Sequence, residues 1–142
     1  MPSASHSVVI NRPASEVFAF VADGENAPRW RTGVLDIQRE SGQGVGAVYR
    51  QGVRGPGGRR VAADYRVTAY QPDTLLAFET IAGPVRPAGE FRLQEAGGAT
   101  TLTLSLRAHL AGVKRLVMSG MGQKTMDAEV AAIDNLQRLL EP

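Results

Sequence analysis

The spacing of hydrophobic residues changes type twice along this chain, and the two changes determine the order of its structural elements. A helical spacing places Val17, Phe18 and Val21 on one side of a segment near the N-terminus, and a second helical spacing occupies residues 121–140. Between them, residues 34–110 have the pattern of successive strands separated by glycine and proline turns. The predicted order is a strand, two short helices, six strands and a long helix, which is an α+β arrangement.

The N-terminal segment contains the signals for a strand and two helices. The first strand is expected at residues 5–11, and Pro13 then suits the first position of a helix, where its missing N–H costs nothing. The Asp-Gly pair at 23–24 is expected to end this helix, and Asn26 is expected to cap a short second helix that carries Trp30.

The middle of the chain predicts an antiparallel meander. Its six strands are expected at residues 34–40, 47–53, 60–70, 75–82, 85–95 and 100–110. Strands 60–70 and 100–110 alternate apolar and polar residues, so the sheet has one apolar face that needs a cover. The amphipathic helix at 121–140 supplies that cover, so we expect a seven-stranded curved sheet wrapped around a long C-terminal helix.

Composition narrows the classes of function. The chain has 142 residues, 43% hydrophobic and 21% charged, which predicts one globular domain spanning residues 1–142. Sixteen basic residues nearly balance 14 acidic ones, so nucleic-acid binding is not expected. Cysteine is absent, and neither a signal peptide nor an apolar run of about 18 residues is evident, so we expect a cytoplasmic protein without a transmembrane segment. The two histidines are far apart in the sequence, and no metal site is expected.

Several motifs together have the pattern of a known family. They are Ile10-x-x-Pro13-Ala14-x-x-Val17-Phe18-x-Phe20-Val21-Ala22-Asp23, then Trp30, then Gly44-x-Gly46-x-x-Tyr49-Arg50, then Tyr65-x-Val67 leading to Pro72 and Leu76-x-Phe78, and finally the closing amphipathic helix. On these motifs the whole chain resembles the polyketide cyclase/dehydrase and lipid-transport superfamily, the SRPBCC or START-like and Bet v 1-like proteins. The resemblance implies a helix-grip fold around a hydrophobic cavity. We expect no cofactor. Similar sequences include small-molecule carriers, aromatic-ring cyclases, coenzyme-Q-binding proteins and toxin-like components, so fold alone does not choose among these functions.

Aromatic, amide and thioether side chains are the candidates for lining such a cavity. Small residues share strand parity with larger apolar ones, which leaves room beside the aromatic side chains. Methionines cluster around the start of the last helix, where flexible thioethers suit varied apolar ligands. The predicted ligand-binding residues are Trp30, Tyr49, Gln51, Tyr65, Phe78, Phe91, Met118, Met121, Met126 and Val130.

Several polar side chains are also predicted to face the cavity or its mouth. The Gln51 amide and the hydroxyls of Tyr49 and Tyr65 are positioned to orient a phenolic or polyketide-like ligand by hydrogen bonds. His6 has the parity of inward-facing residues and is a candidate for one end of the cavity, although a solvated histidine is the alternative. Five basic residues stand at two loops and belong either to a mouth that attracts an anionic ligand head or to a solvated surface. They are Arg54, Arg59 and Arg60 around a glycine-rich hairpin, and Lys114 and Arg115 before the last helix.

Three functions therefore remain open. The first is binding or transport of an apolar or aromatic small molecule, which needs only a cavity between sheet and helix. The second is a cyclase or dehydratase that folds its substrate in a dry pocket. The third is a protein-interaction module, and a homodimer stays among the open oligomeric states.

Overall fold

The computed structural model describes residues 3–83, 86–108 and 126–141, and in this part of the chain eight strands form one antiparallel sheet. The strand order is β1-β8-β7-β6-β5-β3-β2, with β4 pairing β3 beside this path. The strands are β1 (Ser3–Ile10), β2 (Val34–Ser41), β3 (Val48–Arg54), β4 (Arg60–Ala62), β5 (Tyr65–Gln71), β6 (Leu75–Thr80), β7 (Pro87–Ala96) and β8 (Ala99–Ala108). The helices are α1 (Ala14–Ala22), the 3-10 helices η1 (Gly24–Arg29) and η2 (Pro56–Gly58), a helical segment at 126–131, and α3 (Ile133–Leu140).

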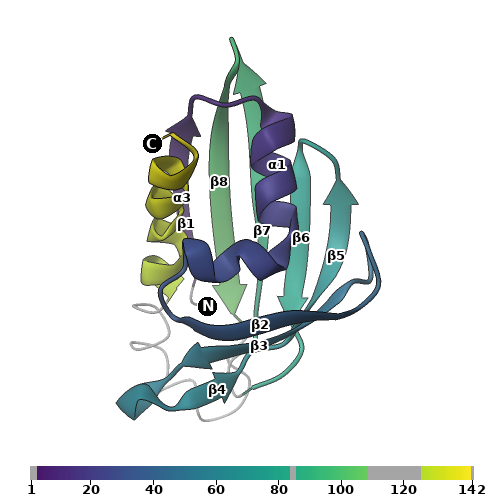
Figure 1. Ribbon diagram of the computed structural model, residues 1–142, viewed down its shortest axis with the longest axis vertical. Coiled ribbons are helices and arrows are strands. Elements are labelled where there is room, and N and C mark those ends of the chain that lie inside the picture. The colour runs from purple at the N-terminus through teal and green to yellow at the C-terminus, as the bar shows by residue number, and fades with distance from the viewer. Residues whose placement is uncertain (1–2, 84–85, 109–125, 142) are drawn as a thin grey trace.

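The helices gather on one face of the curved sheet. Figure 1 shows α1, η1 and α3 on the same side, with β2 and β3 curving across below them. Side chains from both layers meet in a core whose fully buried members include Ile10, Val17, Leu102, Ile133 and Leu136. The predicted α+β architecture, an antiparallel sheet against a C-terminal helix with two short helices after the first strand, is confirmed. No helix within the described ranges is long and apolar enough to cross a membrane.

The predicted strand at 60–70 is wrong in one respect, because it is broken at residues 63–64 into β4 and β5. At the break, the Asp64 carboxylate accepts a hydrogen bond from the Gln51 backbone N–H (3.1 Å), and Ala63 N–H donates to the Gln51 carbonyl (2.8 Å). A side chain thus replaces one bond of the regular ladder and divides the strand, which adds one strand to the seven predicted. The register with β3 is the same on both sides of the break, since Gly52 pairs with Ala62 and Tyr49 with Tyr65.

The start of η1 also differs from the prediction. Asp23, not Asn26, caps this helix: its carboxylate accepts a hydrogen bond from Glu25 N–H (3.1 Å). Asn26 instead donates from Nδ2 to the Phe20 carbonyl (3.1 Å), and Trp30 follows the helix as its C-cap. Asp23 can serve both helices because its extended backbone ends α1 and leaves the carboxylate free for the next N-terminus.

Three side-chain contacts hold α3 against the N-terminal part of the chain. His6 Nε2 lies 2.9 Å from Asp134 Oδ1, and Gln137 donates from Nε2 to the Val9 carbonyl (2.7 Å). Asn135 donates from Nδ2 to the Trp30 carbonyl (3.0 Å). His6 therefore does lie on the inner face, but it contacts α3 and does not line the cavity described below.

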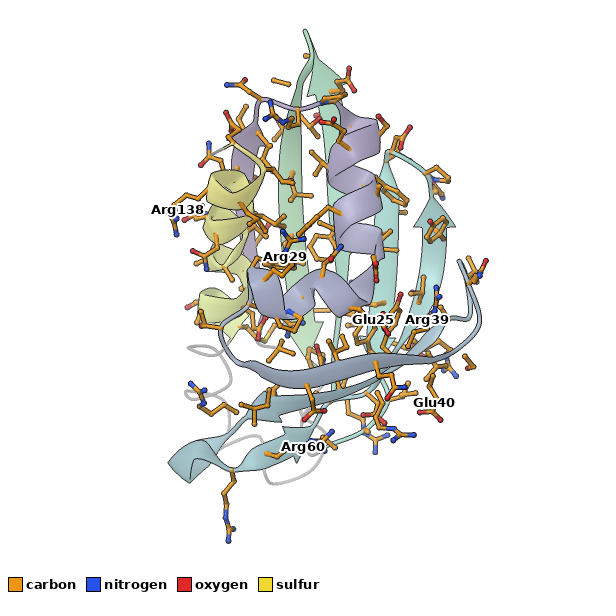
Figure 2. The ribbon with its side chains drawn as sticks, in the orientation of Figure 1. Glu25, Arg29, Arg39, Glu40, Arg60 and Arg138 are labelled. Atoms are coloured by element: carbon orange, nitrogen blue, oxygen red, sulfur yellow. The ribbon has the colours of Figure 1, made fainter. Side chains whose placement is uncertain are left out.

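The edge strand β2 is covered by η1. Glu25 of η1 accepts a hydrogen bond from the Arg39 backbone N–H (2.9 Å), and Figure 2 shows these two residues side by side. Two register shifts, between Val34 and Asp36 and between Arg39 and Ser41, interrupt the pairing of β2 with β3. This edge of the sheet is therefore irregular and partly occupied by a side chain.

Candidate ligand-binding cavity

A cavity of about 310 Å³ lies between the sheet and the helices. Residues from the end of α1, from η1 and the two positions after it, from β3 to β8 and from the helical segment at 126–131 line it, and the lining is mainly apolar. The volume falls at the lower end of the range of roughly 300–1,000 Å³ that is usual for small-molecule sites. It therefore suits a compact ligand.

Five aromatic rings in mutual contact form one wall, which we call the aromatic arc. Tyr49 and Tyr65 are stacked with ring centroids 5.0 Å apart, and Tyr65 lies 5.7 Å from Phe78. Phe78 lies 6.1 Å from Phe91, which lies 6.1 Å from Trp30 in an edge-to-face arrangement. Four of the rings come from the consecutive neighbours β3, β5, β6 and β7, so strand alternation and register bring them to one face.

Seven of the ten predicted residues line the cavity. They are Trp30, Tyr49, Gln51, Tyr65, Phe78, Phe91 and Met126. The prediction is wrong for Val130, which lies one helical turn beyond Met126, packs in the core and is not part of the cavity lining. Met118 and Met121 lie outside the described residues.

Three polar side chains that line the cavity are hydrogen-bonded to one another, a contact that strand parity alone does not predict. Arg31 donates from Nε and Nη2 to the two carboxylate oxygens of Glu129 (2.9 and 3.1 Å) and from Nη1 to Gln51 Oε1 (2.8 Å). Gln51 in turn donates from Nε2 to the Ala63 carbonyl (3.0 Å). We call Arg31, Gln51 and Glu129 the polar seam. Gln51 therefore positions Arg31, in addition to facing the cavity as predicted.

Arg31 and Glu129 are lining residues that sequence reasoning missed. Glu129 is three residues after Met126, so helical spacing sets it beside the apolar face, and Arg31 directly follows Trp30. Their closeness to Met126 and Trp30 is the only local sequence signal that they line the cavity. The pairing itself joins residues 98 positions apart and has no signature in the sequence.

The two stacked tyrosines use their hydroxyls differently. Tyr49 donates to the Ala22 carbonyl across 3.4 Å, whereas the Tyr65 hydroxyl has no hydrogen-bond partner among the residues that the structure describes. It lies against Gly24, where a Cβ would come within 2.2 Å of Tyr65 Oη and 2.8 Å of Tyr49 Cε2. Only glycine lets η1 approach the pair this closely.

Burial raises the pKa of Tyr65 above its ordinary value of 10.0. The neighbouring Tyr49 raises it further, and Arg31 acts in the opposite direction. The phenol therefore keeps its proton near neutral pH and is available as a donor.

The charged side chains that line the described part of the cavity are Asp23, Arg31, Arg54 and Glu129. Arg31 and Glu129 neutralise each other, and Asp23 and Arg54 are exposed. Of the basic residues predicted at a mouth, Arg54 lines the cavity, whereas Arg59 and Arg60 do not, and Lys114 and Arg115 lie outside the described residues. Arg60 instead forms a two-bond ion pair with Asp36 (2.8 and 2.9 Å) that lowers the pKa of Asp36. No group of three or more histidine, aspartate or glutamate residues within the described ranges could hold a metal ion.

Comparison with known proteins identifies the family. The family model described as polyketide cyclase/dehydrase and lipid transport matches residues 1–141. The chain belongs to this family. No curated protein matches the chain significantly.

Solved structures support the same assignment of fold for this polyketide cyclase/dehydrase family member. TTHA0849 from Thermus thermophilus is 16% identical, with a TM-score of 0.82 over 98% of this chain and 97% of its own. A START superfamily protein from Mycobacterium smegmatis is 17% identical, with a TM-score of 0.73 over 97% and 98% of the two chains. The Zhui aromatase/cyclase from Streptomyces sp. R1128 is 20% identical, with a TM-score of 0.68 over 96% and 94%. At these identities the likeness concerns the fold.

Proposed function

We propose that the protein binds an apolar or aromatic small molecule in the cavity and acts as its carrier. The observation that supports this best is the aromatic arc, five connected rings along one wall of a cavity of about 310 Å³. Planar aromatic ligands stack on such rings, and apolar burial supplies most of the binding free energy in sites of this kind. Trp30, the single tryptophan, lies in the wall and reports on occupancy.

The polar groups of the site favour a carrier over an enzyme. Arg31, Gln51 and Glu129 are bonded to one another, so none of them stands as a free acid or base toward a ligand. His6 contacts Asp134 instead of the cavity. Acid–base catalysis requires a titratable group within reach of the substrate, and the polar seam holds its own groups together.

A cyclase or dehydratase is the second candidate, and the Tyr65 hydroxyl is the observation that favours it. A phenol that keeps its proton beside the cavity is able to polarise a ligand carbonyl. One structural relative is an aromatase/cyclase, which makes this chemistry compatible with the fold.

Binding of the neutral dye N-phenyl-1-naphthylamine tests the carrier function. We expect saturable one-to-one binding that changes Trp30 fluorescence, and loss of binding in Thr80→Phe, which adds a ring to the cavity wall. Thr101→Phe is the matched control, because Thr101 pairs with the exposed Val9 and does not line the cavity. Equal dye binding by both variants would contradict a ligand in this cavity.

Native mass spectrometry of protein purified from its own host separates the two candidates. A carrier retains a molecule that is released unchanged, whereas an enzyme incubated with that molecule converts it. Conversion that Tyr65→Phe abolishes would replace the carrier by the enzyme.

A further inference from the structure

The Tyr65 hydroxyl is a hydrogen-bond donor that has no acceptor in the described part of the chain. Tyr65 lines the cavity and its hydroxyl lies next to Gly24 of η1, while its ring is stacked on Tyr49 and tilted by 60° against Phe78. These ring contacts hold Oη in place, so a ligand acceptor must lie within hydrogen-bond distance of that one position. A ligand that supplies an acceptor there keeps this hydroxyl hydrogen-bonded, whereas a ligand that covers it without an acceptor leaves the donor unsatisfied, so the first ligand binds more tightly.

Charge restricts the ligand further. The inward cation Arg31 is already held by both carboxylate oxygens of Glu129, at 2.9 and 3.1 Å. An anionic ligand that pairs with Arg31 would have to displace Glu129, and a cationic ligand that pairs with Glu129 would have to displace Arg31, which leaves one charge unpaired where the two side chains are 17% and 28% exposed. The other lining charges, Asp23 and Arg54, are exposed, and an ion pair with a ligand gains little there. A neutral ligand avoids both costs.

The geometry points to a ligand class, and this inference rests on the proposed function. We propose that the ligand is a neutral aromatic molecule carrying a carbonyl-type oxygen, which lies along the aromatic arc and accepts a hydrogen bond from Tyr65. Tyr65 is then a specificity-determining residue: the arc selects flat apolar molecules, and the hydroxyl selects those with an acceptor at one end.

Two compounds of equal shape test the hydrogen bond. They are 2-acetylnaphthalene and 2-isopropenylnaphthalene, which has CH2 in place of the oxygen, and their dissociation constants are measured by Trp30 fluorescence and calorimetry. Dividing the alkene constant by the ketone constant cancels shape, and comparing that ratio between wild type and Tyr65→Phe cancels the difference in hydration of the two compounds. We expect the ratio to fall about fivefold in Tyr65→Phe, the effect of one hydrogen bond, through weaker binding of the ketone.

Matched variants assign the effect to this hydroxyl. Tyr70 lies outside the cavity, so Tyr70→Phe should keep the wild-type ratio. A drop in Tyr49→Phe with no drop in Tyr65→Phe would make Tyr49 the donor and overturn the proposal. Urea unfolding of each variant confirms that the fold is kept.

Binding of the anion 2-naphthoate at pH 7.5 tests whether the site prefers a neutral ligand. We expect it to bind at least tenfold more weakly than the ketone, and equal or tighter binding would overturn the neutrality of the ligand. If both neutral compounds bind but the ratio is the same in wild type and Tyr65→Phe, only this inference fails. If neither neutral compound binds, the proposed function fails and this inference fails with it.

Discussion

The aromatic arc and the polar seam line the same cavity but are built in opposite ways. The rings of the arc come mostly from neighbouring strands and touch in sequence, each in contact with the next. The seam joins three distant parts of the chain: Arg31 after η1, Gln51 on β3 and Glu129 on the helical segment at 126–131. The arc is thus a product of sheet register, and the seam is a product of tertiary docking.

This difference teaches how each region responds to change. Apolar contacts are non-directional, so loss of a ring from the arc costs its burial and the space it leaves behind. Charged hydrogen bonds are directional, and removing one partner leaves the other unpaired. The seam should therefore be sensitive to the identity of single atoms, and the arc to the volume of whole side chains.

The largest effect is expected from the arc, in Phe91→Ala. Phe91 is 7% exposed and contacts Trp30 and Phe78, so we expect a loss of about 3 kcal/mol in the free energy of unfolding. This is the low end for phenylalanine, because part of the ring borders a cavity that is already present. Urea unfolding measures it, and Phe91→Leu, which keeps most of the volume, should lose about 1 kcal/mol. Equal losses in both variants would show that volume does not govern the arc.

The seam should respond next, in Glu129→Ala. Arg31 is 17% exposed on its side chain and would lose both charged hydrogen bonds, so we expect a loss of about 2 kcal/mol. Glu129→Gln keeps an acceptor of the same shape and should recover about half of that. Glu79→Ala, which removes the exposed ion pair with Arg66, is the matched control and should cost less than about 0.5 kcal/mol. If the control loses as much as Glu129→Ala, burial does not distinguish the seam from surface ion pairs.

A smaller loss is expected where η1 meets the tyrosines of the arc. In Gly24→Ala the added Cβ would lie 2.2 Å from Tyr65 Oη, so either η1 or the tyrosine pair must shift, at a cost of about 1–2 kcal/mol. Gly33→Ala is the control, since nothing lies within 4 Å of its added Cβ. Thermal unfolding compares the two variants, and an equally stable Gly24→Ala protein would show that η1 is loosely packed on the arc.

The smallest effect concerns the pH dependence of stability. Below pH 10 both the folded and the unfolded chain keep the Tyr65 proton, so this group leaves stability unchanged with pH. Above pH 10 the unfolded chain releases the proton while the folded chain retains it, because burial raises the folded pKa, and the free energy of unfolding falls as pH rises. Tyr65→Phe should lose this part of the slope. Absorbance at 295 nm, wild type minus variant, gives the titration of Tyr65 directly, and a midpoint at or below 10 would contradict the burial argument.

The arc was predictable from the sequence because its information is local. Strand alternation gives the parity of Tyr49, Tyr65, Phe78 and Phe91, and parity decides which face a residue occupies. Apart from the broken strand at 60–70, the predicted strands begin and end within two residues of the observed ones, the last being followed to Ala108, where the described residues stop.

What escaped prediction depends on contacts between distant residues. Asp64 breaks a strand only because its carboxylate reaches Gln51 N–H on β3, and its own neighbours carry no sign of this. In the sequence, Arg31 and Glu129 each have the pattern of an ordinary surface charge, and only the packing of the helical segment brings them together. Val130 has the same helical spacing as Met126, yet the cavity ends between them, since spacing assigns a face but not the depth at which the packing closes.

The Glu25 contact with the edge strand β2 has a consequence for the solubility of the protein. Free backbone N–H groups on an edge strand are a template on which another chain can add a strand, the first step of edge-to-edge aggregation. Glu25 occupies the Arg39 N–H, and the two register shifts of β2 bend the remaining edge. A second chain arriving at this edge would have to displace a carboxylate and match an irregular strand, so self-association by sheet extension is discouraged at β2.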